Sequence, residues 1–254
     1  MQVGILGCGA IANIIVNHIM DDDSDIEINY FFDNDIERAE NLANIAGGIA
    51  VLDFEKMVDK VDLVLEAASP ESVETFALKV LEKGKDIIIM SIGALMDRKL
   101  RENLINIAQK NNAKIHAPSG AVVGLDGIKA ISDSSITKAT LITRKPPKSL
   151  GKDTDKEEIL FEGKASEAVK KFPVNINVAA AVSLACKRDI HVKILVDPKV
   201  NRNIHEIIIK GNFGEFNTKV MNFPCSANPK TSMLAALSAI KLLKSFNETF
   251  SIGT

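Results

Sequence analysis

The sequence has few cysteines and almost no excess of charge. It carries three cysteines, Cys8, Cys186 and Cys225, in 254 residues. Their odd number and wide spacing indicate neither a disulfide framework nor a zinc site, so we expect a cytoplasmic chain without a metal. The 31 basic and 33 acidic residues give a formal net charge of −2. This balance predicts no nucleic-acid partner and no attraction to an anionic membrane.

The sequence also lacks a long apolar run. No uninterrupted apolar stretch approaches the ~20 residues that span a bilayer, so we expect no membrane segment. The chain enters a predicted core strand at Val3, and we expect no signal peptide. Internal repeats and low-complexity segments are also absent from the sequence. Its length suits one large domain or two modest ones, with enough residues for a hydrophobic core.

Short apolar runs alternate with amphipathic stretches over residues 1–117. This alternation predicts an α/β domain with a parallel sheet and helices on both faces. A helix is expected to begin with Ser69 as its cap and Pro70 in its first turn. The other predicted elements are strands at 3–6, 26–32, 61–66, 87–90 and 114–116, and helices at 11–20, 36–45 and 97–111.

The pattern changes after residues 118–120, Pro-Ser-Gly, and residues 118–226 are predicted to form a second, α+β domain. Residues 144–158 are polar, contain two prolines and are expected to form an exposed loop. A C-terminal segment, 227–254, is expected to return its helix to the first domain. The predicted strands are 135–143, 189–196, 203–210 and 215–222, the last three antiparallel, and the predicted helices are 166–171, 177–186 and 231–244.

A G-x-G-x-x-A motif, residues 7–12, lies between the first predicted strand and the first predicted helix. Gly7 permits a tight turn, Gly9 lets the backbone approach a pyrophosphate, and Ala12 allows close helix–strand packing. The free N–H groups that begin the helix favour an anion. We therefore predict a Rossmann dinucleotide site with contacts from Gly7, Gly9, Ala10, Ile11 and Ala12. The alternative is a tight turn that binds no ligand.

Asp33 ends the second predicted strand, 21 residues after Ala12. An acid at this place bonds the ribose hydroxyls of the adenosine and repels a 2′-phosphate, which favours NAD. Arg38 lies nearby and could partly neutralise that phosphate, so NADP stays open as a second cofactor. Loops beyond two further strands are expected to edge the cofactor, although ordinary turn chemistry also explains them. Their candidate contacts are Ala67, Ala68, Ser69, Ser91 and Gly93.

Four histidines are candidates for the proton acceptor that a dehydrogenase needs. His18 lies in the first predicted helix, and we interpret it as structural. His116 ends the fifth predicted strand, near the expected cofactor edge. His191 begins a strand of the second domain without polar company, and His205 lies on the next strand. For each of the four, a structural histidine with a hydrogen bond is a simpler interpretation than a catalytic one. His205 is the first among the catalytic candidates.

Residues 228–232, Asn-Pro-Lys-Thr-Ser, predict a helix start with Thr231 or Ser232 as its cap. Its N–H groups and hydroxyls, together with Lys230, would favour an anion. We therefore expect a carboxylate site here, with Arg144 as a weaker candidate. Asn177 is by default another helix cap.

Taken together, these motifs resemble the archaeal and bacterial L-aspartate dehydrogenase family. The resemblance spans nearly the whole chain, and its more specific blocks lie in the second half. One departure is Ala12, where the family often has a third glycine. The blocks are Gly7–Ala12, Glu66–Ser69, Ser91–Ala94, Pro118–Asp126, Phe161–Ala168, Phe172-Pro173, Asn175–Ala180, Asn203–Glu206 and Asn228–Ser232.

The resemblance implies a Rossmann domain followed by an α+β catalytic and dimerisation domain, in a homodimer. It implies that His205 is the catalytic histidine and that Ala121 and Asn177 contact the cofactor. The implied reaction transfers hydride from L-aspartate to NAD(P) and yields iminoaspartate, which hydrolyses to oxaloacetate and ammonia or feeds NAD biosynthesis. The substrate contacts expected with it are Ser119, Gly120, Asn228, Lys230, Thr231 and Ser232.

Two other functions remain open from the sequence. One is another small amino-acid dehydrogenase, such as a homoserine-type enzyme, with the same layout. The other is a non-catalytic dinucleotide sensor, which would bind the dinucleotide without turnover. A cysteine-nucleophile aldehyde dehydrogenase is disfavoured, because Cys8 lies in the dinucleotide turn and no cysteine has a histidine close in sequence.

Overall fold

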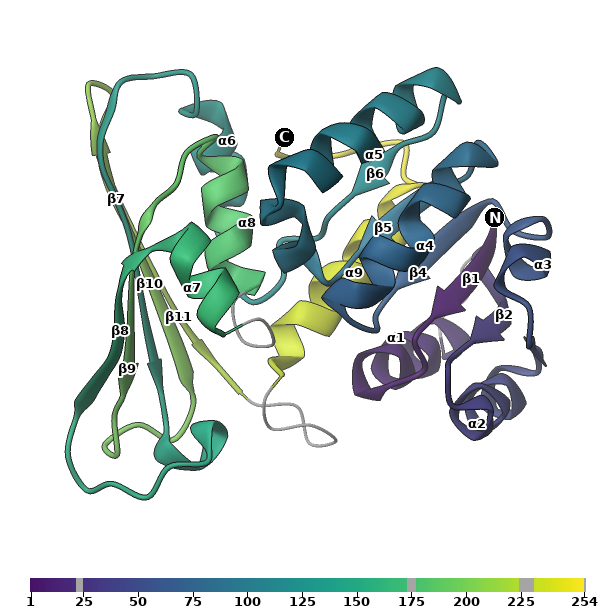
Figure 1. The fold of residues 1–254 in the computed structure, drawn as a ribbon, viewed down its shortest axis with the longest axis horizontal. Coiled ribbons are helices and arrows are strands. Elements are labelled where there is room, and N and C mark those ends of the chain that lie inside the picture. Colours follow the sequence, from purple (N-terminus) through teal and green to yellow (C-terminus); the bar gives the residue numbers. More distant parts are fainter. Residues whose placement is uncertain (22–24, 173–176, 224–230, 254) are drawn as a thin grey trace. The chain divides into compact units, whose positions relative to one another are not determined.

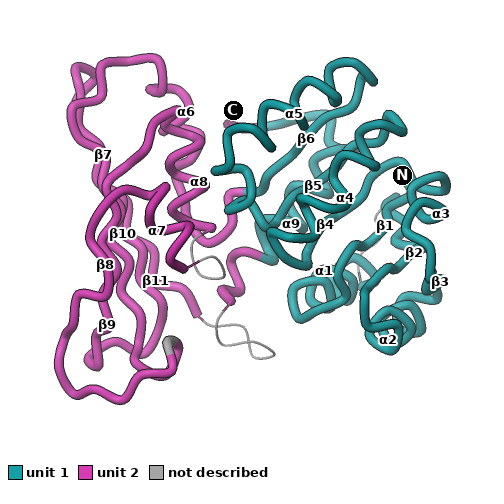
Figure 2. The backbone as a smooth tube through the Cα atoms, viewed as in Figure 1, with its two compact units in different colours: residues 1–118, 236–251 teal, residues 119–235, 252–254 magenta. Residues whose placement is uncertain are grey.

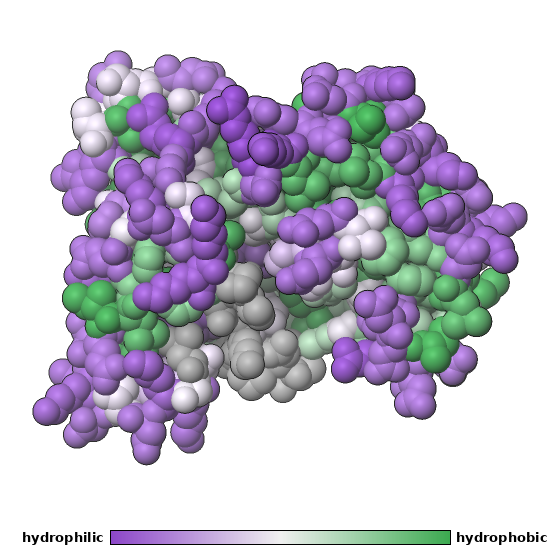
Figure 3. Space-filling model, in the orientation of Figure 1, coloured by the Kyte–Doolittle hydropathy of each residue, from purple (hydrophilic) through white to green (hydrophobic). Residues whose placement is uncertain are grey.

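The computed structural model describes residues 1–21, 25–172, 177–223 and 231–253. The chain folds into two compact units (Figure 2). Unit 1 comprises residues 1–118 and 236–251, and unit 2 comprises residues 119–235 and 252–254. Hydrophilic residues are spread over the viewed surface of each unit, with smaller hydrophobic areas between them (Figure 3). No helix among the described residues is long and apolar enough to cross a membrane.

Unit 1 is built on a six-stranded parallel sheet in the order β3-β2-β1-β4-β5-β6 (Figure 1). The winding reverses between β1 and β4, and ligands of such sheets bind beyond the strand ends at this switch point. The apolar runs become strands buried on both faces, as in Val64, Leu65 and Ile88, which are 0% exposed. The strands are β1 Gln2–Leu6, β2 Glu27–Phe32, β3 Ile49–Ala50, β4 Leu63–Glu66, β5 Asp86–Ile89 and β6 Ile115–His116.

Several helices of unit 1 begin at a capping side chain, whereas the first helix, after Gly9, does not. Ser69 accepts a hydrogen bond from the Ser72 N–H at 3.3 Å, and Pro70 is the first residue of the helix that follows, as the sequence predicted. The short elements β3, α3 and η1 were not predicted, because two to five residues are too few to show a period. The helices are α1 Ala10–Met20, α2 Ile36–Ala46, α3 Phe54–Val58, α4 Pro70–Glu82, the 3₁₀ helix η1 Ile92–Met96, and α5 Arg98–Lys110.

The last helix, α9 (Met233–Ser245), belongs to unit 1 from Ala236 onward. It buries a stripe of apolar side chains, including Ile240 and Leu243. Beyond its end, the Phe246 ring meets the ring of His116 edge-on, with 4.8 Å between the centroids. A segment from the end of the sequence therefore completes a sheet domain that begins at the first residue.

Unit 2 contains a mixed five-stranded sheet in the order β11-β10-β7-β9-β8. The predicted antiparallel arrangement of residues 189–196 is wrong in one respect, because β9 runs parallel to β7, which lies between β9 and β10. A parallel pair needs a long crossover connection, and β8, α7 and α8 supply it. The strands are β7 Ile136–Lys145, β8 Glu158–Lys164, β9 His191–Val196, β10 Asn203–Gly211 and β11 Gly214–Asn222.

Helices lie against one side of this sheet in Figure 1. They are α6 Leu125–Ala130, α7 Ala165–Lys171 and α8 Asn177–Ala185. The prediction of an exposed loop over residues 144–158 is wrong at both ends of this segment and in part of its middle. Residues 144 and 145 continue β7, residues 147–150 form the 3₁₀ helix η2 (Pro147–Leu150), and β8 begins at Glu158.

Alternate burial along β7 separates the two faces of this sheet. Leu141, Thr143 and Lys145 are buried on the face that the helices cover, whereas Ile142 and Arg144 between them are partly exposed on the other face. We call these the covered face and the open face. A polar residue on the covered face is therefore removed from water, which makes such residues informative about function.

A buried carboxylate joins two loops at the edge of the unit 1 sheet. Glu66, the last residue of β4, is 0% exposed. One carboxylate oxygen accepts from the Ala68 N–H at 2.9 Å and the Ser91 hydroxyl at 2.8 Å, and the other accepts from the Ser91 N–H at 2.9 Å. Burial raises the pKa of Glu66, and these hydrogen bonds partly oppose that rise. Glu66 thus fixes the loop after β4 to the loop after β5.

We predict that Glu66→Ala lowers the free energy of unfolding by about 3 kcal/mol, because it leaves buried N–H and O–H donors without an acceptor. Denaturant titration followed by circular dichroism measures this loss. The control is Glu74→Ala on the exposed side of α4, which is expected to change the same free energy by less than about 0.5 kcal/mol. Equal small effects of both substitutions would show that the carboxylate is not a structural link.

Candidate functional site

The turn between β1 and α1 has the geometry that a dinucleotide requires. Gly7 has a φ of +93°, and a Cβ at this position would lie 2.5 Å from the Cβ of Ala68, so only glycine fits. Gly9 precedes α1, and a Cβ there would meet nothing within 4 Å. The space beside Gly9 is therefore open to a ligand that approaches the N-terminus of α1. Ala12 is fully buried, whereas Ala10 and Ile11 are partly exposed.

Asp33 lies beside this turn, at the end of β2. One of its carboxylate oxygens accepts from the Cys8 N–H at 2.7 Å, and the other accepts from the Asp35 N–H at 2.9 Å. These bonds orient a partly exposed carboxylate next to the open backbone of the turn. Arg38 pairs with Asp35 at 3.1 Å rather than with Asp33. Both members of that ion pair are about half exposed or more, so it is weak enough to exchange for another anion.

The loops after β4 and β5 reach the same edge of the sheet. The Ala67 N–H donates to the Leu6 carbonyl at 2.8 Å, which locks the loop after β4 onto the end of β1. Ser91 and Gly93 are buried, and Ser91 is held by Glu66. The hydroxyl of Ser69 caps α4. The structure thus gathers all the unit 1 candidates at the carboxyl edge of one parallel sheet.

The described cysteines are poor nucleophiles. Burial, with a smaller contribution from Asp33, raises the pKa of the Cys8 thiol to about 12. Burial also raises the pKa of Cys186 to about 11. Both thiols therefore stay protonated near neutral pH, which disfavours cysteine-based catalysis.

His205 lies on the covered face of unit 2 and is 5% exposed. The strand register pairs it with Thr143 of β7, and the Thr143 hydroxyl oxygen is 3.0 Å from His205 Nδ1. Burial, together with the charge of Lys145, lowers the pKa of His205 to about 3. The imidazole is therefore neutral near neutral pH and is held by one ring nitrogen, so it can accept a proton.

The other three histidines have structural partners. His18 on α1 lies 3.5 Å from the Lys244 ammonium, and His116 lies 3.4 Å from the Asp86 carboxylate. The interpretation that His191 lacks polar company is wrong, because Glu162 lies 3.3 Å from its Nε2. Glu162 belongs to β8, a strand that was not predicted from the sequence.

The unit 2 candidates are spread over several elements. Ser119 and Gly120 begin the unit in a turn, where Gly120 has a φ of +67°. The Ala121 carbonyl accepts from the Asn222 side chain at 2.7 Å. Asn177 is exposed and is the first residue of α8.

The predicted carboxylate site before α9 is described only in part. Ser232 immediately precedes α9 and is 6% exposed, and its hydroxyl has no hydrogen-bond partner within the described part of the chain. Thr231 is partly exposed, and Asn228 and Lys230 lie outside the described residues. Arg144 pairs with Glu157 and Asp197 on the open face, away from His205.

Two buried polar residues near His205 were not predicted from the sequence as site residues. Lys145 is 5% exposed, and Asn203 is 4% exposed with its side-chain oxygen lacking a hydrogen-bond partner. Lys145 fell in the segment predicted as a loop, and Asn203 fell in a family-like block without a role of its own. Their one sequence signal is alternation with apolar neighbours at the ends of β7 and β10.

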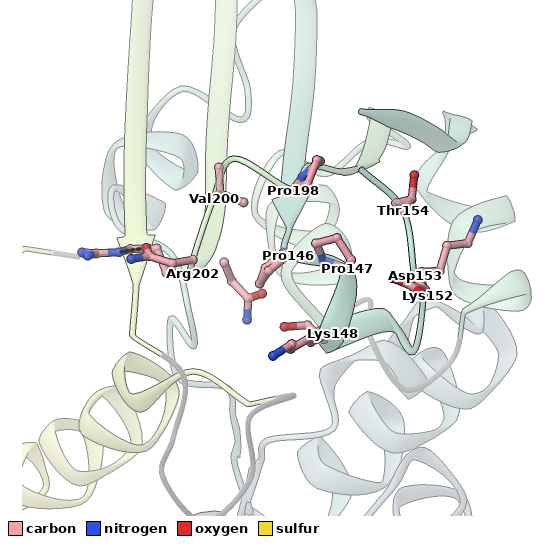
Figure 4. Close-up of a pocket in the computed structure, with 12 residues that line it drawn as sticks. Pro146, Pro147, Lys148, Lys152, Asp153, Thr154, Pro198, Val200 and Arg202 are labelled. Carbon is pink, nitrogen blue, oxygen red and sulfur yellow. Dashed lines mark hydrogen bonds between the residues drawn. The ribbon is translucent and has the colours of Figure 1, made fainter. Parts of the chain in front are cut away.

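A cavity of about 510 Å³ opens at this end of the sheet (Figure 4). The loops after β7 and before β10 line it, and Asn203 forms part of its wall. Lys148, Lys152 and Arg202 outnumber the single lining acid, Asp153. The cavity is therefore suited to attract an anion.

Comparisons with known proteins cover both halves of the chain. Residues 7–118 match the family model described as "Homoserine dehydrogenase, NAD binding domain", so this half is an NAD(P)-binding domain. Residues 126–246 match the model described as "Aspartate dehydrogenase, C-terminal". The predicted Rossmann and α+β fold classes are confirmed.

Relatives align with the chain from end to end. The L-aspartate dehydrogenase of Methanothermobacter thermautotrophicus is 58% identical over 254 residues, which cover 100% of this chain and 99% of the relative. The L-aspartate dehydrogenase of Methanospirillum hungatei is 41% identical, with 100% of both chains covered.

Solved structures agree with these relatives. The crystal structure of aspartate dehydrogenase from Thermotoga maritima matches with a TM-score of 0.84 and 32% identity, covering 100% of this chain and 99% of that chain. GenD2 of gentamicin A biosynthesis, in complex with NAD, has a TM-score of 0.61 at 12% identity and so shares the fold alone. Since both the catalytic-half family model and full-length relatives agree, this chain belongs to the L-aspartate dehydrogenase family.

Proposed function

We propose that this chain catalyses the oxidative deamination of L-aspartate with NAD as the hydride acceptor. The observation that carries the proposal is the 58% identity, over the full length, to an L-aspartate dehydrogenase. The geometry of both units supports it. Unit 1 offers an open glycine turn beside an oriented carboxylate, and unit 2 offers a neutral histidine buried in a polar cluster.

The unit 1 residues would hold the dinucleotide. The N–H groups at the start of α1, beyond Gly9, would bind the pyrophosphate, and Asp33 would accept from the ribose hydroxyls. The loops at Ala67–Ser69 and Ser91–Gly93 would line its edge. When bound, the cofactor supplies a nicotinamide ring that accepts hydride at C4. The Asp33 carboxylate favours NAD, and the weak pairing of Arg38 leaves room for NADP.

His205 would accept a proton from the substrate ammonium, directly or through a water molecule. The neutral amine then carries the electron pair that becomes the C=N bond as hydride leaves the α-carbon, and the product is iminoaspartate. The same imidazole would assist attack of water on the imine, which releases ammonia and gives oxaloacetate. The low pKa of His205 belongs to the unliganded site, and the carboxylates of the substrate would raise its proton affinity.

Further contacts follow from the family. Ala121 and Asn177 would contact the cofactor. Ser119, Gly120, Thr231 and Ser232 would contact the substrate, together with Asn228 and Lys230 outside the described residues. The buried Ser232 hydroxyl without a hydrogen-bond partner in the described part supports a polar ligand there. Iminoaspartate would also be available for NAD biosynthesis.

We also propose that two copies associate through the open face of the unit 2 sheet. Ile159 and Met221 on this face are 56% and 52% exposed, and Ile142 and Ile208 between them are partly exposed. Apolar side chains exposed together on an uncovered sheet are typical of a protein–protein interface. A second copy of this chain would bury them by face-to-face packing.

A homoserine-type dehydrogenase is the second candidate, because the dinucleotide-binding half matches a homoserine dehydrogenase domain. We predict that L-aspartate alone, among L-aspartate, L-homoserine and L-glutamate, supports rapid NAD reduction, followed at 340 nm. We expect this preference because the second half of the chain matches the C-terminal domain model of aspartate dehydrogenase. Reduction with homoserine and none with aspartate would reverse the assignment, and binding without any turnover would indicate a sensor.

His205→Asn is expected to lower kcat at least 100-fold while the Kd for NADH changes less than twofold. The magnitude is that of losing a general acid–base group. Stopped-flow kinetics and fluorescence titration measure the two quantities. His191→Asn, at the partly exposed first residue of β9, is the matched control and should keep wild-type kcat. A similar kcat for His205→Asn and the wild type would remove His205 from the mechanism.

Asp33→Ser is expected to shift cofactor preference from NAD toward NADP by at least tenfold in kcat/KM, because it removes the charge that repels the 2′-phosphate. Asp33→Asn is the companion variant. Its side-chain oxygen can still accept from the Cys8 N–H, so it removes the negative charge and keeps this hydrogen bond. If the repulsion is correct, both variants gain activity with NADP. If the ratio of kcat/KM with NAD to kcat/KM with NADP is unchanged in both variants, the assigned role of Asp33 is contradicted.

A further inference from the structure

The end of the covered face around His205 carries a concentrated polar cluster. Thr143 and Lys145 on β7, with Asn203 and His205 on β10, are each 4–6% exposed. Side chains two residues apart on a strand share a face, and the register pairs His205 directly with Thr143. All four therefore belong to one face at one end of the β7–β10 pair.

Lys145 places a cation in this cluster, where it is buried from solvent. Burial lowers its pKa to about 8, and its charge in turn lowers the pKa of His205. The two basic groups are thus close enough to affect each other, and a bound anion would be favourable to both. The ammonium has three N–H donors, so it can keep its contact within the protein and still bind a carboxylate oxygen.

Asn203 places an acceptor without a donor in the same cluster. Its side-chain oxygen is buried and lacks a hydrogen-bond partner among the described residues. Leaving such an oxygen unsatisfied lowers the stability of the folded state, so its persistence points to a ligand that donates an N–H or O–H. Asn203 also borders the cavity of about 510 Å³, whose charged lining residues are three basic and one acidic, and this gives an anionic small molecule a route to it.

We propose that this cluster is the amino-acid subsite of the enzyme, in which Lys145 binds a carboxylate of the substrate and the Asn203 side-chain oxygen accepts from its amino group. The inference rests on the proposed function and assigns two residues to it. The cation selects an acidic ligand, the orphan acceptor selects an amine, and His205 lies beside both. A substrate that carries both groups is held with its amino nitrogen next to the proposed base.

Calorimetry on the enzyme loaded with NADH separates the two roles, because neither L-aspartate nor succinate reacts in that complex. Succinate has the carboxylates of aspartate but no amine. Lys145→Met should weaken the binding of both ligands at least tenfold. Asn203→Val should lower the affinity for L-aspartate to the level of the affinity for succinate. The affinity for succinate itself should not change. Lys138→Met, at the exposed end of β7, is the matched control and should bind both as the wild type does.

NADH affinity reports whether each variant is folded, and Lys145→Gln gives the same comparison if the methionine variant does not fold. Wild-type affinity for succinate in a folded Lys145 variant would overturn the carboxylate role. Equal weakening of both ligands by Asn203→Val would overturn the amine role. Aspartate-dependent NAD reduction by the wild type, measured alongside, tests the proposed function separately. Turnover with unaffected variants rejects only the subsite, whereas absence of wild-type turnover rejects the function.

Discussion

The buried carboxylate of Glu66 connects the parts of unit 1 on which dinucleotide binding would depend. Its oxygens bind donors from the loops after β4 and β5. The loop after β4 in turn approaches Gly7 so closely that no side chain fits between them. Asp33, at the end of β2, completes the series by accepting from the Cys8 N–H. The ends of four neighbouring strands are thereby fixed to one another, and the glycine turn sits on a rigid edge rather than on an isolated loop.

In unit 2, by contrast with Glu66, a buried polar group lacks a hydrogen-bond partner within the described residues. The sheet of this unit buries basic and amide groups where apolar packing would be more stable, and it leaves the Asn203 oxygen without a donor within the described residues. A buried polar group that lacks its partner lowers stability and is uncommon in native proteins. Such departures from good packing concentrate where a ligand completes the hydrogen bonds. The covered face near His205 therefore has the energetics expected of a ligand-binding site.

Local signals in the sequence predicted most of unit 1. The apolar runs, the glycine motif and the Ser69 cap each depend on residues within a few positions of one another, so they can be recognised without the fold. The parallel pairing of β7 with β9 could not be found this way, because register between distant strands leaves no local pattern. Strand β8 was missed because charged residues and Gly163 interrupt its apolar pattern.

The candidate site shows the same division. Gly7, Gly9 and Asp33 could be assigned from spacing alone, since the motif spans one strand, one turn and one helix. His205 gained its role only through the family resemblance, because its strand looks like any half-buried strand. Lys145 follows Arg144 and precedes two prolines, a context that indicates a loop. Only the pairing of β7 with β10 brings it to the covered face beside a histidine 60 positions away.

The two-part composition of unit 1 has a consequence for how the chain is made. The residues of α9 that pack within this unit come more than a hundred positions after its last strand, β6. At a synthesis rate of about 5–20 residues per second, the nascent sheet waits at least several seconds for the helix that covers it. During that interval unit 2 is emerging from the ribosome. The first domain to begin folding is thus among the last to be completed, and its exposed apolar surface must stay unaggregated until translation reaches the C-terminal helix.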